Sequence, residues 1–188
     1  MIMRQTRLFA LIGISFTMIL FASCKKKNVD APNEEELITT VKVTLTPIGG
    51  GVPVVAEWKD LDGPGGALPV IGNISLDPGK SYNCALDFLD ETKSPVDEIT
   101  DEIVSEGTDH QIYYEATGVN LTINGLDTDT GGLPLGTTSV WTTGAAGIGS
   151  LKIILKHKPG TKAAGDLVTK GETDVSVDLP VVIQPIIL

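Results

Sequence analysis

Residues 41–46 have the sequence Val-Lys-Val-Thr-Leu-Thr, in which apolar and polar side chains alternate. Successive side chains of a β-strand point to opposite faces of its sheet, so this period of two predicts a strand with one buried face. Pro47 and three consecutive glycines at 49–51 follow the stretch, and residues of these types end strands. The stretch therefore predicts the first half-buried strand of a β-rich domain.

Stretches of the same kind recur along the chain. Residues 77–80, Asp-Pro-Gly-Lys, have the pattern of a type II turn. This turn predicts that the strands before and after it pair as a hairpin, and that the first four strands form a meander. Pro180 predicts a bulge or an edge strand within the last stretch. The eight further strands are predicted at residues 52–58, 70–76, 82–89, 111–116, 119–124, 137–143, 151–157 and 175–184.

One segment, residues 94–107, departs from the strand pattern and predicts a short amphipathic helix. Ser94 is a suitable N-cap, and Pro95 is suited to the first helical position. Ile99 and Ile103 would lie on one apolar face, and a glycine ends the segment. About nine strands with one helix predict an all-β, immunoglobulin-like antiparallel β-sandwich with one short helix in a connection.

The N-terminus has the features of an export signal. Arg4 and Arg7 precede a run of 15 uncharged residues at 8–22, which as a helix would be about 22 Å long and too short for a bilayer core of about 30 Å. Residues 21–24, Phe-Ala-Ser-Cys, resemble the bacterial lipobox, in which the cysteine is acylated and becomes the new N-terminus. The chain is therefore predicted to contain a signal peptide at 1–23, a lipid-anchored flexible tether at 24–36 and a β-sandwich domain at 37–188.

The acyl group on Cys24 would be the link to the membrane. The mature chain, residues 24–188, has 12 Lys and 24 Asp and Glu, a net charge of −12. This charge argues against binding nucleic acid or an anionic membrane face by electrostatics. If Cys24 is acylated, Cys84 has no partner for an internal disulfide, and its place in an alternating stretch predicts a buried strand residue.

Six short stretches together resemble one protein family. They are the lipobox at 21–24, Glu-Glu-Glu-Leu-Ile-Thr-Thr-Val at 34–41, Asp-Leu-Asp-Gly at 60–63, Asp-His-Gln-Ile-Tyr-Tyr at 109–114, Leu-Lys-His-Lys-Pro-Gly at 155–160 and Gly-Glu-Thr-Asp at 171–174. Residues 21–184 resemble uncharacterised small cell-envelope lipoproteins of Bacteroidota, particularly flavobacteria. Such proteins often carry the label "type 1 periplasmic binding fold", but 165 residues with one helix are too few for its two α/β lobes.

The resemblance implies a lipoprotein of the outer membrane, on its periplasmic or its outer face, that works beside an outer-membrane receptor or transporter. The sequence contains no G-x-S-x-G, H-E-x-x-H, Walker or C-x-x-C motif. A non-enzymatic binding module, which contacts a partner or ligand through loops at one end, is therefore the favoured function.

The alternative function is a metal- or haem-binding accessory to an uptake receptor. His110 begins one predicted strand and His157 ends another. If both strand ends met at one rim, with a carboxylate between them, the two imidazoles could bind a transition metal, or haem through both rings. Isolated histidines at strand ends are otherwise ordinary surface residues.

Two acidic, glycine-rich loops are candidates for calcium, the one cofactor that the sequence suggests. Asp60 and Asp62 lie in the first loop, and Asp127 and Asp129 lie in the second. Carboxylates two residues apart on a pliable loop are typical of Ca²⁺ ligands. Neither loop completes an EF-hand, and the same residues are common in simple turns.

The aromatic residues allow one more hypothesis. Trp58 and Trp141 could stack on sugar rings as a surface pair, although their places in or next to strands favour the core. Tyr113 and Tyr114 are adjacent in a predicted strand and must point to opposite faces.

Overall fold

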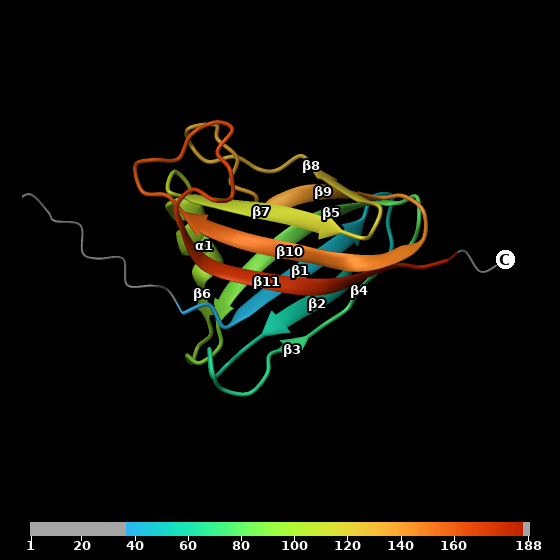
Figure 1. The fold of residues 1–188 in the computed structure, drawn as a ribbon, viewed down its shortest axis with the longest axis horizontal. Helices are drawn as coiled ribbons and strands as arrows, with labels where there is room; N and C mark the ends of the chain where they lie inside the picture. Colours follow the sequence, from blue (N-terminus) through green and yellow to red (C-terminus); the bar gives the residue numbers. More distant parts are fainter. Residues whose placement is uncertain (1–36, 186–188) are drawn as a thin grey trace, which may run out of the picture. The chain divides into compact units, whose positions relative to one another are not determined.

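The computed structural model describes residues 37–185, which form two β-sheets and one short helix (Figure 1). The sheets face each other across an apolar core, so the predicted all-β sandwich is confirmed. The signal peptide, Cys24 and the tether predicted at 24–36 lie outside the described residues.

The first sheet contains seven strands in the order β3-β2-β1-β5-β9-β8, with β6 pairing beside β5. All its pairs are antiparallel. The strands are β1 (Thr40–Pro47), β2 (Val54–Lys59), β3 (Val70–Ile71), β5 (Ser81–Asp90), β6 (Asp97–Glu98), β8 (Leu121–Asn124) and β9 (Thr138–Thr143).

The second sheet contains four strands in the order β4-β11-β10-β7. Its strands are β4 (Ile74–Leu76), β7 (His110–Thr117), β10 (Gly147–His157) and β11 (Glu172–Ile183). β10 pairs antiparallel with both neighbours, whereas β4 pairs parallel with the end of β11. β4 has three residues and β11 has twelve, so β4 covers only one end of β11.

The core follows from the alternation in the sequence. Val41, Val43 and Leu45 are fully buried, whereas Lys42 and Thr44 between them are half-buried. Removing such aliphatic side chains from water contributes about 25 cal/mol per Å² of apolar surface. The alternation in the sequence thus gives each such strand one buried face, and these buried faces form the core of the sandwich.

Residues 70–76 were predicted as one strand, and the structure divides them between the two sheets. β3 pairs with β2, and β4 pairs with β11. The chain crosses at Gly72, whose N–H donates to the carbonyl of Glu57 at 2.7 Å. A Cβ at Gly72 would lie 3.0 Å from the Glu57 nitrogen, so the close approach of the two backbones favours glycine.

The predicted hairpin between 70–76 and 82–89 is wrong, and so is the meander of four strands. β5 returns to pair with β1, with Val43 opposite Leu86. Ile74 and Leu76 of β4 instead bury their side chains beside β11 of the other sheet. Burial of the apolar faces of β4 and β5 in their separate sheets, rather than the turn at 77–80, decides which strands pair.

The helix is also shorter than predicted. α1 (Ile99–Ser105) begins after Asp97 and Glu98, which pair with β5 as β6. Its N-cap residue is Glu98 without a side-chain cap, so Ser94 and Pro95 do not begin the helix. Ile99 and Ile103 are buried against the sandwich as the sequence predicts.

Candidate binding site

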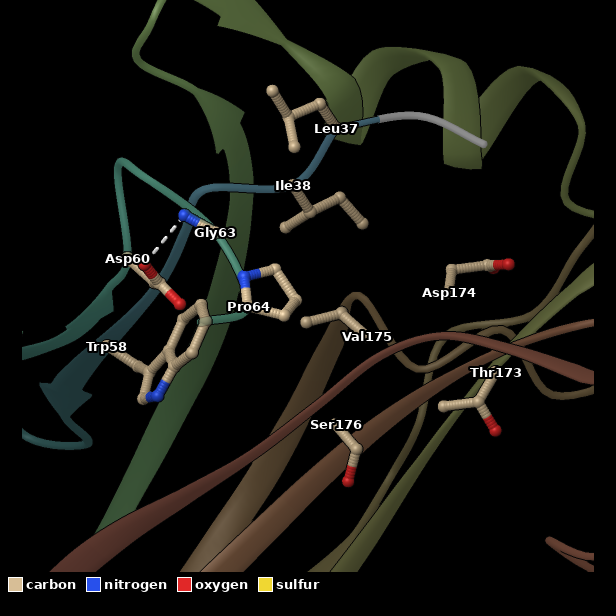
Figure 2. A pocket seen from close by; sticks show the side chains of 10 residues that line it. All are labelled: Leu37, Ile38, Trp58, Asp60, Gly63, Pro64, Thr173, Asp174, Val175 and Ser176. Atoms are coloured by element: carbon tan, nitrogen blue, oxygen red, sulfur yellow. Dashed lines mark hydrogen bonds between the residues drawn. The ribbon is translucent and has the colours of Figure 1, made fainter. Parts of the chain in front are cut away.

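A pocket of about 480 Å³ opens between the two sheets, next to the start of β11 (Figure 2). Its walls come from three distant parts of the chain: the residues before β1, the end of β2 with the loop that follows, and the start of β11. In Figure 2, Ile38, Pro64 and Val175 lie around the centre of the pocket. The lining residues are Leu37, Ile38, Trp58, Asp60, Gly63, Pro64, Thr173, Asp174, Val175 and Ser176.

Strand pairing positions the aromatic wall. Trp58 lies between Val41 and Ile71 on the neighbouring strands and is half-buried. Trp141, by contrast, is completely buried and donates its indole N–H to Ser139 Oγ at 2.8 Å. The structure therefore places Trp141 in the core and Trp58 at the pocket wall, so the two do not form a surface pair.

Asp60 and Asp62 shape the loop on this side of the pocket. Asp60 Oδ1 accepts a hydrogen bond from the Gly63 N–H at 2.9 Å, and Asp62 Oδ2 accepts one from the Ala67 N–H at 2.8 Å. The bond from Ala67 lowers the pKa of Asp62. Both aspartates thus accept hydrogen bonds from backbone N–H groups of their own loop, as aspartates in turns commonly do.

Asp174 lies at the opposite wall, in an irregularity of β11. Leu155 pairs with Val175 and Lys156 pairs with Thr173, so Asp174 is an extra residue in the ladder. Such a β-bulge re-aims a side chain. The Asp174 carboxylate is 15% exposed, and its Oδ2 lies 3.9 Å from His110 Nε2.

The structure brings His110 and His157 together. They are directly opposite each other on β7 and β10, and their rings stack at 4.8 Å with planes 16° apart. Both residues are buried, and His110 Nδ1 lies 3.2 Å from the carbonyl oxygen of Glu106. The rings pack face to face, although a shared metal would have to lie in the plane of both. Among residues 37–185, no group of three His, Cys, Asp or Glu side chains is placed to hold a metal ion.

Acidification is expected to destabilise the domain through His110. Burial, and then the nearby His157, lower the pKa of His110 below its ordinary 6.5. Below about pH 6.5 the unfolded chain then binds more protons than the folded one. The free energy of unfolding therefore decreases as the pH is lowered. The melting temperature should fall between about pH 7.5 and 5.5, and fall less for His110→Gln. Parallel curves for the two proteins would contradict this assignment.

The carboxylate of Asp127 accepts three hydrogen bonds from residues 136–138. Its Oδ1 accepts from the Gly136 and Thr138 N–H groups at 2.8 and 3.0 Å, and its Oδ2 accepts from Thr137 Oγ1 at 2.5 Å. These bonds use three of the roughly four lone-pair sites of the carboxylate, which leaves one site on Oδ2. The calcium hypothesis stays a prediction, and the hydrogen bonds account for this carboxylate as part of a folded turn.

Asp129 forms a buried ion pair, which the sequence does not predict. Lys162 Nζ donates to Asp129 Oδ2 and to the Gly107 carbonyl, both at 2.7 Å, and the two charged side chains are 1% exposed. Burial opposes ionisation of Asp129, but the bonds from Lys162 and the backbone outweigh it and lower its pKa. The pair ties the loop after β10 to the loop after β8.

A second buried lysine lies nearby. Lys158 is completely buried, and its Nζ donates to Gln111 Oε1 at 2.8 Å and to the Tyr113 hydroxyl at 2.5 Å. Burial lowers its pKa, although Asp166 at 3.7 Å acts in the opposite direction. The clustering of four of the domain's nine lysines within residues 156–170 is the sequence signal that could have pointed to this region.

The remaining predicted core residues are placed as expected. Cys84 is buried, and burial raises its pKa to about 12, so its thiol stays protonated. Tyr114 packs edge-on against Trp141 in the core, whereas Tyr113 contacts Lys158 outside it. The two tyrosines therefore point to opposite faces.

Comparisons with protein-family models, with curated proteins and with solved structures found no match. Within residues 37–185, no helix has the length and apolar character needed to cross a bilayer.

Proposed function

We propose that this protein is a non-enzymatic, lipid-anchored binding module of the cell envelope, which uses the pocket between its sheet edges to contact an outer-membrane transport protein. The observation that carries the proposal is the pocket itself. It has the volume of a ligand site, and it combines an aromatic and aliphatic wall with a few polar groups.

The composition of the walls supports binding. Trp58, Ile38 and Val175 offer apolar contact, and half-buried tryptophans are typical anchors of interfaces. Asp60 and Asp174 add negative charge, and none of the ten lining residues is Lys or Arg. The pocket is therefore suited to a partner that presents apolar and basic groups.

The lipobox supports the place of action. Acylation of Cys24 would hold the domain near a membrane, and the tether that the sequence predicts at 24–36, which lies outside the described residues, would reach about 20 Å as a coil of 13 residues. Leu37, the first described residue, lines the pocket. A short tether that ends at the site would keep the pocket close to partners in the same membrane.

Photo-crosslinking in intact cells tests the binding function. A crosslinking amino acid at position 37, where Leu37 is 51% exposed, is expected to capture an integral outer-membrane transport protein. The matched control is position 148. Ile148 is 74% exposed and pairs with Val182, at the opposite end of β11 from the pocket residues 173–176. Equal capture at both positions, or no capture at 37, would contradict the proposal.

Loss of the anchor is a separate measurement. Cys24→Ser is expected to abolish acylation, measured by mass spectrometry of the N-terminal peptide. An acylated Cys24→Ser protein would contradict the lipid anchor while leaving the pocket assignment to the crosslinking result.

A further inference from the structure

β11 is paired on one side along its length and on the other side only at its end. β10 pairs with it from Glu172 to Ile183, whereas β4 pairs only with residues 181–183. Figure 1 shows β4 beside one part of β11 alone. Between 172 and 180, no strand of the described residues 37–185 pairs with the β4 side of β11, and we call this stretch the open edge.

The direction of the backbone groups at the open edge follows from a bond at the end of β11. The N–H of Gln184 donates to the carbonyl of Leu76, so Gln184 directs its main chain toward β4. Main-chain groups of a strand alternate between its two sides, so the residues two, four, six and eight positions earlier face the same way. Pro180 is one of them, and a proline without N–H is tolerated where the nitrogen faces no partner strand. Ser176 and Asp178 thus direct N–H and C=O groups to the open edge.

The open edge adjoins the pocket. Thr173, Asp174, Val175 and Ser176 belong to both. An added strand would lie about 4.8 Å from β11. Alternate side chains of that strand would turn inward, toward the apolar wall that Ile38 and Trp58 form in Figure 2. Main-chain bonds and side-chain pockets are the two elements of recognition by strand addition.

The charge of the domain indicates the charge of the segment that it would bind. Residues 37–185 contain 9 Lys and 20 Asp and Glu, a net charge of −11. Asp60 and Asp174 lie in the pocket, and Glu172 and Asp178 are exposed on β11. A segment with basic side chains complements this surface, and an acidic one is repelled.

We propose that the open edge of β11 binds an extended, basic segment of the partner polypeptide as an added strand, with its apolar side chains in the pocket. This inference rests on the proposed binding function and names how the partner is recognised. The regular part of the open edge, from the residue after the bulge at Asp174 to Pro180, has six residues and matches a strand of ordinary length, about five or six residues.

Peptide probes test the inference on the acyl-free domain, with residues 37–185 intact. The first probe is a blocked peptide of about eight residues in which lysine and valine alternate. The second has glutamate in place of lysine, and the third is the lysine peptide with alternate backbone nitrogens methylated. Binding is followed by the fluorescence of Trp58, since Trp141 is completely buried, and by amide NMR signals.

The lysine peptide is expected to bind, to shift the emission of Trp58 and to protect the amides of Ser176 and Asp178 from exchange. The methylated peptide should bind at least about tenfold more weakly, because it lacks the N–H donors along one edge of the strand but keeps the charge. The glutamate peptide should show no binding. Equal affinity of the methylated and unmethylated peptides would overturn strand addition, since charge alone would then explain the binding.

A variant of the chain gives a second test. Ser176→Pro removes an N–H from the open edge and is expected to leave the ladder with β10 intact, as Pro180 does. It should weaken the lysine peptide about tenfold and reduce crosslinking from position 37. Capture at position 37 that Ser176→Pro leaves unchanged, with no peptide binding, would overturn the inference and leave the proposed function standing. Should Ser176→Pro not fold, the methylated peptide decides.

Discussion

Replacing Lys162 by methionine is expected to lower the free energy of unfolding by about 3–5 kcal/mol. The substitution removes both bonds from Nζ and leaves the carboxylate of Asp129 charged, buried and without its cation. An isolated buried charge is far more costly than the loss of the pair as a whole. Urea denaturation of the wild-type and variant domains at pH 7 measures the difference.

Two further variants make this prediction specific. Lys152 pairs with Asp178 at 3.4 Å, but these side chains are 40% and 61% exposed, so Lys152→Met should cost less than about 1 kcal/mol. Adding Asp129→Asn to Lys162→Met should recover much of the loss, because asparagine still accepts the bonds from Gly131 and Leu133. A Lys162→Met protein as stable as Lys152→Met would show that the buried pair contributes little.

Gly149→Ala is expected to destabilise the domain by about 3 kcal/mol, in the upper range for an overpacked site. A Cβ at Gly149 would lie 2.1 Å from the carbonyl oxygen of Thr117 and 2.7 Å from the nitrogen of Val119. Both atoms belong to the backbone, so no side chain can rotate to relieve the clash. The end of β7 and the chain after it would have to move away from β10.

Gly147→Ala is the matched control in the same strand. A Cβ there meets nothing within 4 Å, so the variant should stay within about 0.5 kcal/mol of the wild type. The comparison cancels any general effect of alanine on β10. If thermal unfolding gave both variants the same melting temperature, the close packing of the chain at Thr117 and Val119 against Gly149 would be incorrect.

The strands could be predicted because their signal is local. Each of the nine predicted stretches overlaps at least one strand of the structure, since alternation such as that of 41–46 reflects one buried face. Strand partners are decided by burial across the whole domain, and no local pattern contains that information. For this reason the turn at 77–80 predicted a hairpin between strands that lie in different sheets.

The site was only partly predictable for the same reason. Trp58 and Asp60 stood out in the sequence, but as candidates for sugar stacking and calcium rather than as neighbours in one pocket. Ile38 and Val175 carry no chemical signal at all and become site residues because β1 and β11 place them there. The bulge at Asp174 depends on the pairing of two long strands, which the sequence does not specify.

The crossing at Gly72 has a consequence for how copies of this protein avoid one another. A single segment, residues 70–76, supplies the outermost strand at one border of each sheet. Both strands are very short, which is a common natural protection against self-association. Local detachment of this one segment would bare the end of β2 and lengthen the open edge of β11, so both sheets would gain unpaired hydrogen-bonding backbone together.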